Sequence, residues 1–109
     1  MKINRIYFHK RYNLGDKHGL SVEEARELCN SDKIINLPVY MYEHSGITIS
    51  TKPFSCRFDS CQIGFIYVDK NEVREHFKVK KISKKILKKV TDMLENDVKE
   101  YDEYLQGNN

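Results

Sequence analysis

Eight side chains in or beside the predicted loops could act as acids, bases, nucleophiles or metal ligands. They are His9, Asp16, His18, His44, Cys56, Asp59, Ser60 and Cys61. Cys56 and Cys61 are separated by four residues, whereas the usual zinc hairpin has two, and no second Cys/His pair is obvious. The spacing therefore predicts no metal site and no cofactor.

A small enzyme would need histidine and aspartate side chains from separate loops to meet. His18, with Asp16 in a glycine-flanked loop, could approach His44 at a hairpin turn and Asp59 in a long loop, and so supply acid–base groups. Nothing in the spacing requires this, because Asp16 and Asp59 are also typical loop-capping residues. Ser60 lacks the motif of a nucleophilic serine. We expect no catalytic residue, and keep a loop enzyme as the second alternative.

The charges divide the chain into a basic part and an acidic part. The 19 basic and 16 acidic residues leave a net charge of +3, but residues 90–109 hold six acids against one lysine, so residues 1–89 carry +8. Seven of the twelve residues from Lys78 to Lys89 are lysine. Such a run can attract phosphate or an acidic protein face, and it is also compatible with an ordinary solvated surface.

A nucleic-acid surface is the first alternative that these charges support. Its binding residues would be Lys80, Lys81, Lys84, Lys85, Lys88 and Lys89. Aromatic residues at strand spacing could stack on bases, although residues with that spacing more often form a core. The signature of RNA-recognition sheets and the spacings of zinc fingers are absent, and a pI of 8.7 is below the usual basic footprint.

The sequence predicts an α+β fold of about four mostly antiparallel strands, two short helices and one long C-terminal helix packed on the sheet. Runs of β-branched and aromatic residues place the strands at 2–8, 37–43, 47–51 and 61–68. Gly46 provides the reversal of a hairpin between the second and third strands. Pro38 fits the start or the edge of a strand, because it has no N–H to donate.

Capping residues mark two short helices. Ser21 with Glu24 forms a capping box before a helix that ends at Cys29, and Asp69 with Glu72 precedes a second helix. Helical spacing predicts that the first helix buries Val22, Ala25, Leu28 and Cys29, and that Val73, His76 and Phe77 lie on one face of the second.

The C-terminal helix has the clearest pattern. Ser83 is the expected N-cap, and Gly107 can close the helix in the left-handed conformation. Apolar residues recur at spacings of three or four, at Ile86, Val90, Leu94, Val98, Tyr101 and Leu105. The long helix must therefore pack its apolar face on the sheet.

The charges on this helix oppose its dipole. Lysines crowd the N-terminal turns and acids the C-terminal turns, which costs about 0.3–1 kcal/mol per terminal charge at low salt. One interpretation is a screened, solvated face with pairs at i, i+4, namely Lys88 with Asp92 and Glu95 with Lys99. The other is a dipolar binding surface, basic at one end and acidic at the other.

Length and composition indicate a single domain over residues 1–109. No apolar stretch approaches the roughly 18–20 residues of a membrane span, and no signal-peptide core follows the first residues, so neither insertion nor export is expected. Three cysteines make a poor disulfide framework and suit a reducing compartment. We therefore expect a cytoplasmic protein without membrane contact.

The stretch from Leu37 to Tyr67 carries a family resemblance. Its densest segments are HSGITIS, PFSC and QIGFIYV, and with the later VKEYDEYLQG they cover residues 37–107. The chain resembles a family of small proteins carried by phages and mobile elements of low-GC Gram-positive bacteria. Where that family usually has Pro-Trp-Asp-Ser-Gly, this chain has Arg57-Phe58-Asp59-Ser60-Cys61.

The resemblance implies a function in evading host defence. Accessory phage genes of this size often counter defence systems, and anti-CRISPR proteins commonly bind an effector complex without chemistry of their own. The expected function is thus stoichiometric inhibition of a host CRISPR–Cas effector nuclease in the host cytoplasm, with the basic run free to contact guide RNA or DNA. The residues predicted to occupy a basic groove of the partner are Glu95, Asp97, Glu100, Tyr101, Asp102, Glu103 and Tyr104.

Overall fold

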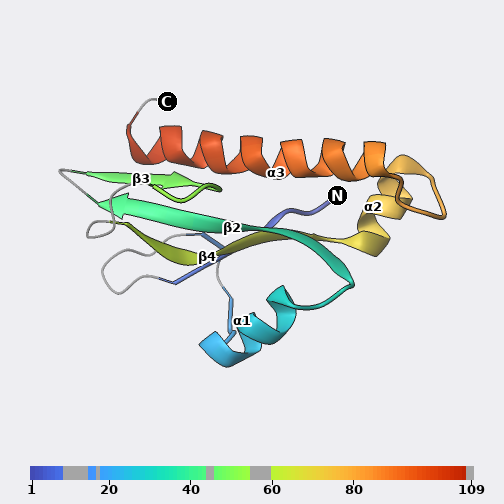
Figure 1. The fold of residues 1–109 in the computed structure, drawn as a ribbon, viewed down its shortest axis with the longest axis horizontal. Helices are drawn as coiled ribbons and strands as arrows, with labels where there is room; N and C mark the ends of the chain where they lie inside the picture. The colour runs from blue at the N-terminus through green and yellow to red at the C-terminus, as the bar shows by residue number, and fades with distance from the viewer. Residues whose placement is uncertain (9–14, 17, 44–45, 55–59, 108–109) are drawn as a thin grey trace.

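The computed structural model describes residues 1–8, 15–16, 18–43, 46–54 and 60–107. Four strands in these residues form one antiparallel sheet, and the longest of three helices lies along one of its faces (Figure 1). The α+β prediction is therefore confirmed. Within the same residues, no helix is long and apolar enough to cross a membrane.

The strands are β1 (Asn4–Tyr7), β2 (Ile34–Glu43), β3 (Ile47–Ser50) and β4 (Ser60–Asp69). Their order in the sheet is β1-β4-β2-β3, and each neighbouring pair is antiparallel. The predicted hairpin between the second and third strands is confirmed by the pairing of Glu43 with Ile47. Two of its predicted turn residues, His44 and Ser45, lie outside the described residues.

The helices are α1 (Val22–Cys29), α2 (Lys70–Phe77) and α3 (Lys84–Leu105). Each begins at a predicted N-cap, because the side chains of Ser21, Asp69 and Ser83 each accept a backbone N–H of the first turn. The Ser21 cap is a complete capping box with Glu24. Local hydrogen bonding thus decides where all three helices start.

The sheet separates two apolar clusters. On one face, the completely buried Val90 and Leu94 of α3 join a cluster that includes Met41 and Ile66 from the two central strands. On the other face, Ala25 of α1 packs in a smaller cluster with Phe65. Figure 1 shows α1 and α3 on opposite sides of the sheet, so β2 and β4 are covered by a helix on each side.

β2 begins three residues earlier than predicted and contains Pro38 in its interior. The Lys70 N–H donates to the Lys33 carbonyl at 2.9 Å. In an antiparallel pair every second residue bonds to the neighbouring strand, so the odd-numbered residues in this part of β2 bond to β4. Pro38 therefore faces the other edge, where its missing N–H breaks no ladder bond. Because β3 pairs with β2 only from Tyr40 onward, the proline also marks the end of that pairing.

Gly64 lets β4 and β1 come together. Its φ is 154°, and a Cβ added there would lie 1.9 Å from the carbonyl oxygen of Ile6. The register with β2 shifts at the same point, between Val39 and Tyr40. A β-bulge beside a glycine is the ordinary way for a strand to change its twist while a neighbouring backbone passes closely.

The burial of Val22 differs from the sequence prediction. Val22 was expected in the core, but 54% of its surface is exposed, and Ala25 is the fully buried residue of α1. In α2, Val73 is completely buried and Phe77 packs against the main cluster, whereas His76 is exposed. Short helices touch the sheet over less than their full apolar stripe, so spacing alone overestimates burial.

Candidate functional site

Asp97 connects the acidic half of α3 to the sheet. Its two carboxylate oxygens accept hydrogen bonds from Nε and Nη2 of Arg5 on β1, each at 2.7 Å. The side chains of Asp97 and Arg5 are 15% and 27% exposed. This bidentate pair is the main cause of a raised pKa at Arg5. The carboxylate of Asp97 is therefore occupied within the fold.

Tyr101 and Asp102 are also engaged internally. The hydroxyl oxygen of Tyr101 accepts the N–H of Gly15 at 2.9 Å, and its ring meets Tyr7 edge-on with centroids 5.9 Å apart. The Asp102 carboxylate accepts the N–H of Ile49 on the edge strand β3 at 3.0 Å. These contacts hold the last turns of α3 on the sheet.

Four of the seven predicted partner-binding residues are exposed: Glu95, Glu100, Glu103 and Tyr104. Glu100 accepts a surface hydrogen bond from Asn96 at 3.2 Å. Among the described ion pairs, the predicted pair of Glu95 with Lys99 does not occur. Partner binding at this end of α3 stays a prediction. These four exposed residues are the ones of the predicted set that a partner could most readily contact.

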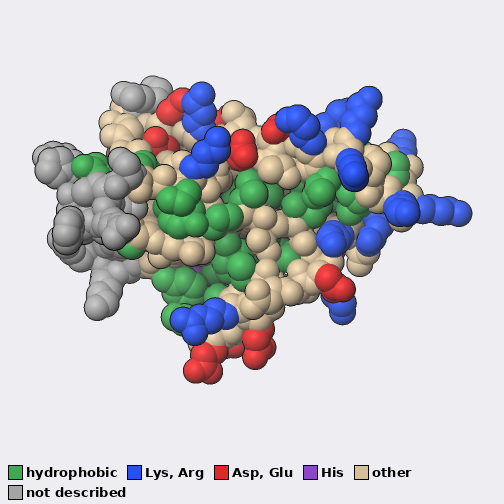
Figure 2. Space-filling view, in the orientation of Figure 1, with side chains coloured by type: hydrophobic (Ala, Val, Ile, Leu, Met, Phe, Trp, Pro, Cys, Tyr) green, Lys and Arg blue, Asp and Glu red, His purple; other side chains and the backbone are tan. Residues whose placement is uncertain are grey.

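The six predicted nucleic-acid-binding lysines lie where the chain turns from α2 into α3. We name this surface the basic corner, and it consists of Lys80, Lys81, Lys84, Lys85, Lys88 and Lys89. All six are exposed, and Figure 2 shows lysine and arginine side chains gathered at this end of the molecule. The turn is fixed by Lys78, which ends α2 with a left-handed φ of 55°. Of these six lysines, Lys88 alone forms an ion pair with a described residue, Asp92, at 3.3 Å.

The loop residues considered for catalysis have structural contacts where they are described. The Asp16 carboxylate accepts the backbone N–H of Arg5 at 2.9 Å, and Nε2 of His18 lies 3.2 Å from the carbonyl oxygen of Tyr7. Cys61 is exposed on β4. The structure describes Ser60 only as the first residue of that strand, and the other candidates, His9, His44, Cys56 and Asp59, lie outside the described residues.

These contacts place Asp16 and His18 against β1. Across the described ranges, no group of three His, Cys, Asp or Glu side chains could hold a metal ion. The loop enzyme that would combine His18 with His44 and Asp59 stays a prediction, because two of its three members are not described.

Tyr7 is a buried tyrosine whose hydroxyl oxygen has no hydrogen-bond partner in the part of the chain that the structure describes. Only 4% of the residue is exposed. Burial raises the pKa of its phenol, and the negative charge of Asp97 adds to that effect. The phenol is therefore neutral at physiological pH and packs as part of the core beneath α3.

Sequence reasoning missed Arg5, although one signal could have found it. Arg5 is a charged residue followed by the apolar run Ile6-Tyr7-Phe8 of the predicted strand, and such a residue needs a partner when the strand is covered. The partner, Asp97, is 92 residues away in the sequence, so no local spacing points to it.

Comparison with protein-family models, curated proteins and solved structures finds no match. Function is therefore inferred from two surfaces of the described chain. One is the basic corner, and the other consists of the four exposed residues at the acidic end of α3.

Proposed function

We propose that the chain is a non-enzymatic binding protein that uses the basic corner to bind nucleic acid. The observation that carries this proposal is the set of six exposed lysines, of which only Lys88 has an ion-pair partner in the described residues. Lysines that fold-internal acids do not neutralise remain available for phosphate oxygens. The acidic end supports a binding role less strongly, since Asp97, Tyr101 and Asp102 already have partners.

The start of α3 adds to the positive potential of the basic corner. Lys84 and Lys85 occupy the first turn, which contains no acid. The backbone N–H groups there carry the positive end of the helix dipole, so the lysines and the dipole attract the same anion. This arrangement lowers stability and strengthens phosphate binding at the same place.

The expected mode of binding is electrostatic and independent of base sequence. Lysine contacts phosphate as a point charge, and it lacks the fixed fork by which arginine reads guanine. If all six lysines met phosphates, log K against log salt would have a slope of about −5 on duplex DNA and about −4 on single strands. A steep salt dependence with little sequence preference is therefore the signature of this function.

The test compares two double variants with the same change of charge. Lys84→Gln with Lys85→Gln removes two charges from the basic corner, and Lys52→Gln with Lys99→Gln removes two exposed lysines elsewhere. Fluorescence anisotropy with a short labelled DNA duplex and its single strand measures affinity across salt concentrations. The first variant should lower the salt slope by about 2 on duplex DNA, and the second should leave it nearly unchanged.

Stability measurements separate lost binding from lost structure. Removing positive charge from the first turn of α3 should stabilise the fold by about 0.3–1 kcal/mol per lysine at low salt. A variant that is more stable and binds DNA less tightly cannot owe its weaker binding to unfolding. Absence of DNA binding by the unaltered chain at low salt, or equal losses in both variants, would refute the proposal.

Inhibition of a host CRISPR–Cas nuclease by protein binding is the second candidate. The observation in its favour is that Glu100, Glu103 and Tyr104 are exposed toward the negative end of the α3 dipole, with Glu95 exposed at the middle of the helix. Carboxylates and a tyrosine on one helical surface can enter a lysine- and arginine-lined groove, with the ring as an anchor. The resemblance of residues 37–107 to a family of phage and mobile-element proteins supports the same role, which is to counter a host defence system.

Affinity capture from a lysate of a CRISPR-bearing host tests this candidate. Glu100→Lys with Glu103→Lys should abolish capture of the effector and inhibition of its DNA cleavage, and Glu23→Lys with Glu27→Lys on α1 is the charge-matched control. Positive charge at a helix C-terminus is favourable, so the first variant should remain folded. Capture that disappears after nuclease treatment of the lysate would instead assign the interaction to nucleic acid.

A further inference from the structure

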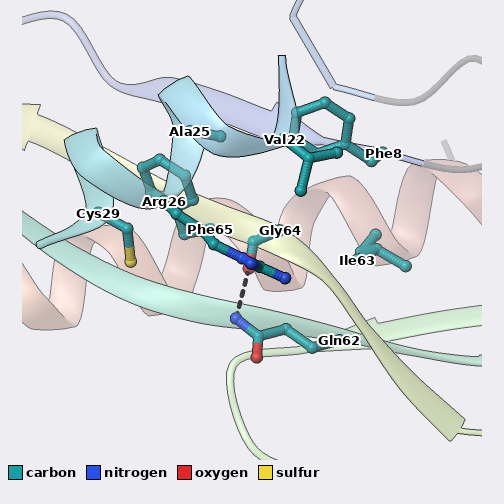
Figure 3. A pocket seen from close by; sticks show the side chains of 9 residues that line it. All are labelled: Phe8, Val22, Ala25, Arg26, Cys29, Gln62, Ile63, Gly64 and Phe65. Carbon is teal, nitrogen blue, oxygen red and sulfur yellow. Dashed lines mark hydrogen bonds between the residues drawn. The ribbon is translucent and has the colours of Figure 1, made fainter. Parts of the chain in front are cut away.

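A cavity of about 360 Å³ lies between α1 and β4, on the face of the sheet opposite α3 (Figures 1 and 3). Most of its lining is apolar, from the half-buried Phe8 at the end of β1 to the buried Phe65 in β4. Ala25 is the fully buried residue of α1, whereas Val22 lines the cavity and is 54% exposed. Ala25 and Phe65 thus pack within the smaller apolar cluster, whereas Val22 leaves apolar surface exposed beside this space.

Arg26 is the charged residue in the lining of this cavity. Figure 3 shows its side chain extending from α1 across the cavity toward Gly64 and Gln62. The Gly64 carbonyl oxygen already accepts from Nε2 of Gln62 at 3.2 Å. In the described residues, no ion pair includes Arg26. A guanidinium group beside an apolar cavity is suited to an anionic head group.

The volume of the cavity limits the size of its occupant. A non-hydrogen atom in a condensed phase fills about as much space as a water molecule, roughly 30 Å³, so the cavity has room for about a dozen such atoms. That is the size of a medium-chain carboxylate. It is also near the lower end of the volumes of small-molecule sites.

We propose that this cavity binds a free carboxylate with an apolar body of medium-chain size, with the carboxylate on Arg26 and the chain between Val22 and Phe65. The head group would form a charge-assisted hydrogen bond at the open side, and the chain would bury apolar surface that α1 leaves exposed. The site is separate from the basic corner, so neither activity depends on the other.

Titration of the ¹⁵N-labelled protein with octanoate tests the proposal. Octanol has the same chain without the charge, and acetate has the charge without the chain. Octanoate should shift the amide resonances of Val22, Ala25, Gly64 and Phe65 in a saturable manner. Arg26→Gln should weaken octanoate binding about five- to tenfold and leave octanol binding unchanged.

Lys33→Gln is the control for general charge effects, because Lys33 is exposed and lies outside the cavity lining. A second variant, Val22→Glu, places a negative charge at the cavity on an exposed position where a first-turn acid suits the helix, and it should also weaken octanoate binding. Octanoate shifts confined to the basic corner, no saturable shift at millimolar octanoate, or equal losses in Arg26→Gln and Lys33→Gln would each overturn the proposal.

Discussion

Asp97→Asn is expected to destabilise the fold, because the pair that Asp97 forms with Arg5 is mostly shielded from water. Both hydrogen bonds are 2.7 Å long, with Nε and Nη2 of Arg5 as donors. An asparagine keeps one carbonyl oxygen for Nε but turns an NH₂ donor toward the second guanidinium donor. The variant thus loses a charge-assisted bond and leaves Arg5 with Asp16 as its carboxylate partner, at 3.3 Å.

The magnitude follows from the exposure of the two side chains, 15% for Asp97 and 27% for Arg5. Exposed pairs contribute about 0.2–1 kcal/mol, whereas breaking a fully buried pair costs about 3–5 kcal/mol. A loss of about 2 kcal/mol lies between these limits. With a urea m-value of about 1–2 kcal/mol per molar, the midpoint of unfolding should fall by about 1–2 M.

A double-mutant cycle separates the pair from other effects of each substitution. Asp97→Asn, Arg5→Gln and the double variant should give a coupling energy of about 1–2 kcal/mol. Glu103→Gln is the matched control on an exposed position of the same helix and should change stability by less than about 0.5 kcal/mol. A coupling energy near zero, or equal effects of Asp97→Asn and Glu103→Gln, would refute the structural role and return Asp97 to the set of candidate partner contacts.

Three further variants test other features of the fold by urea or thermal unfolding. Tyr7→Phe removes a buried hydroxyl that has no partner among the described residues. The change should leave stability unchanged or raise it by up to about 1 kcal/mol, and a clear loss would mean that the hydroxyl is bonded. Gly64→Ala places a methyl group 1.9 Å from a β1 carbonyl oxygen and should cost more than about 3 kcal/mol, whereas Gly19→Ala meets nothing within 4 Å and should be nearly neutral. Ser83→Ala removes the N-cap of α3 and should cost about 1 kcal/mol, which Ser83→Asp should recover; equal stability of the two would argue against the cap.

The sequence predicts those elements that local interactions determine. Ser21, Asp69 and Ser83 mark the three helix starts, because a capping side chain bonds only a few residues away. The apolar residues of α3 recur with helical spacing, and Val90 and Leu94 are completely buried as that spacing predicts. The six lysines of the basic corner likewise stay together, since they lie within ten residues of one another around a single turn.

The sequence does not predict contacts that depend on how distant segments meet. The partners of Asp97 and Asp102 are Arg5 and the N–H of Ile49, and both become neighbours only when α3 lies across the sheet. The exposure of Val22 has the same origin, because it depends on how closely α1 approaches β4. For that reason the acidic end looks like a free surface in the sequence but proves to be partly occupied in the fold.

The charges of α3 therefore fall into two groups. In the last turn, Asp102 and Glu103 oppose the dipole, and the Asp102 carboxylate accepts the N–H of Ile49, so the fold offsets the cost of one of these two charges. In the first turn, Lys84 and Lys85 oppose the dipole as well, and no acid in that turn offsets them. A local conflict without compensation inside a fold is expected where a residue serves binding instead of stability. This difference is why we propose the basic corner, ahead of the acidic end, as a binding surface.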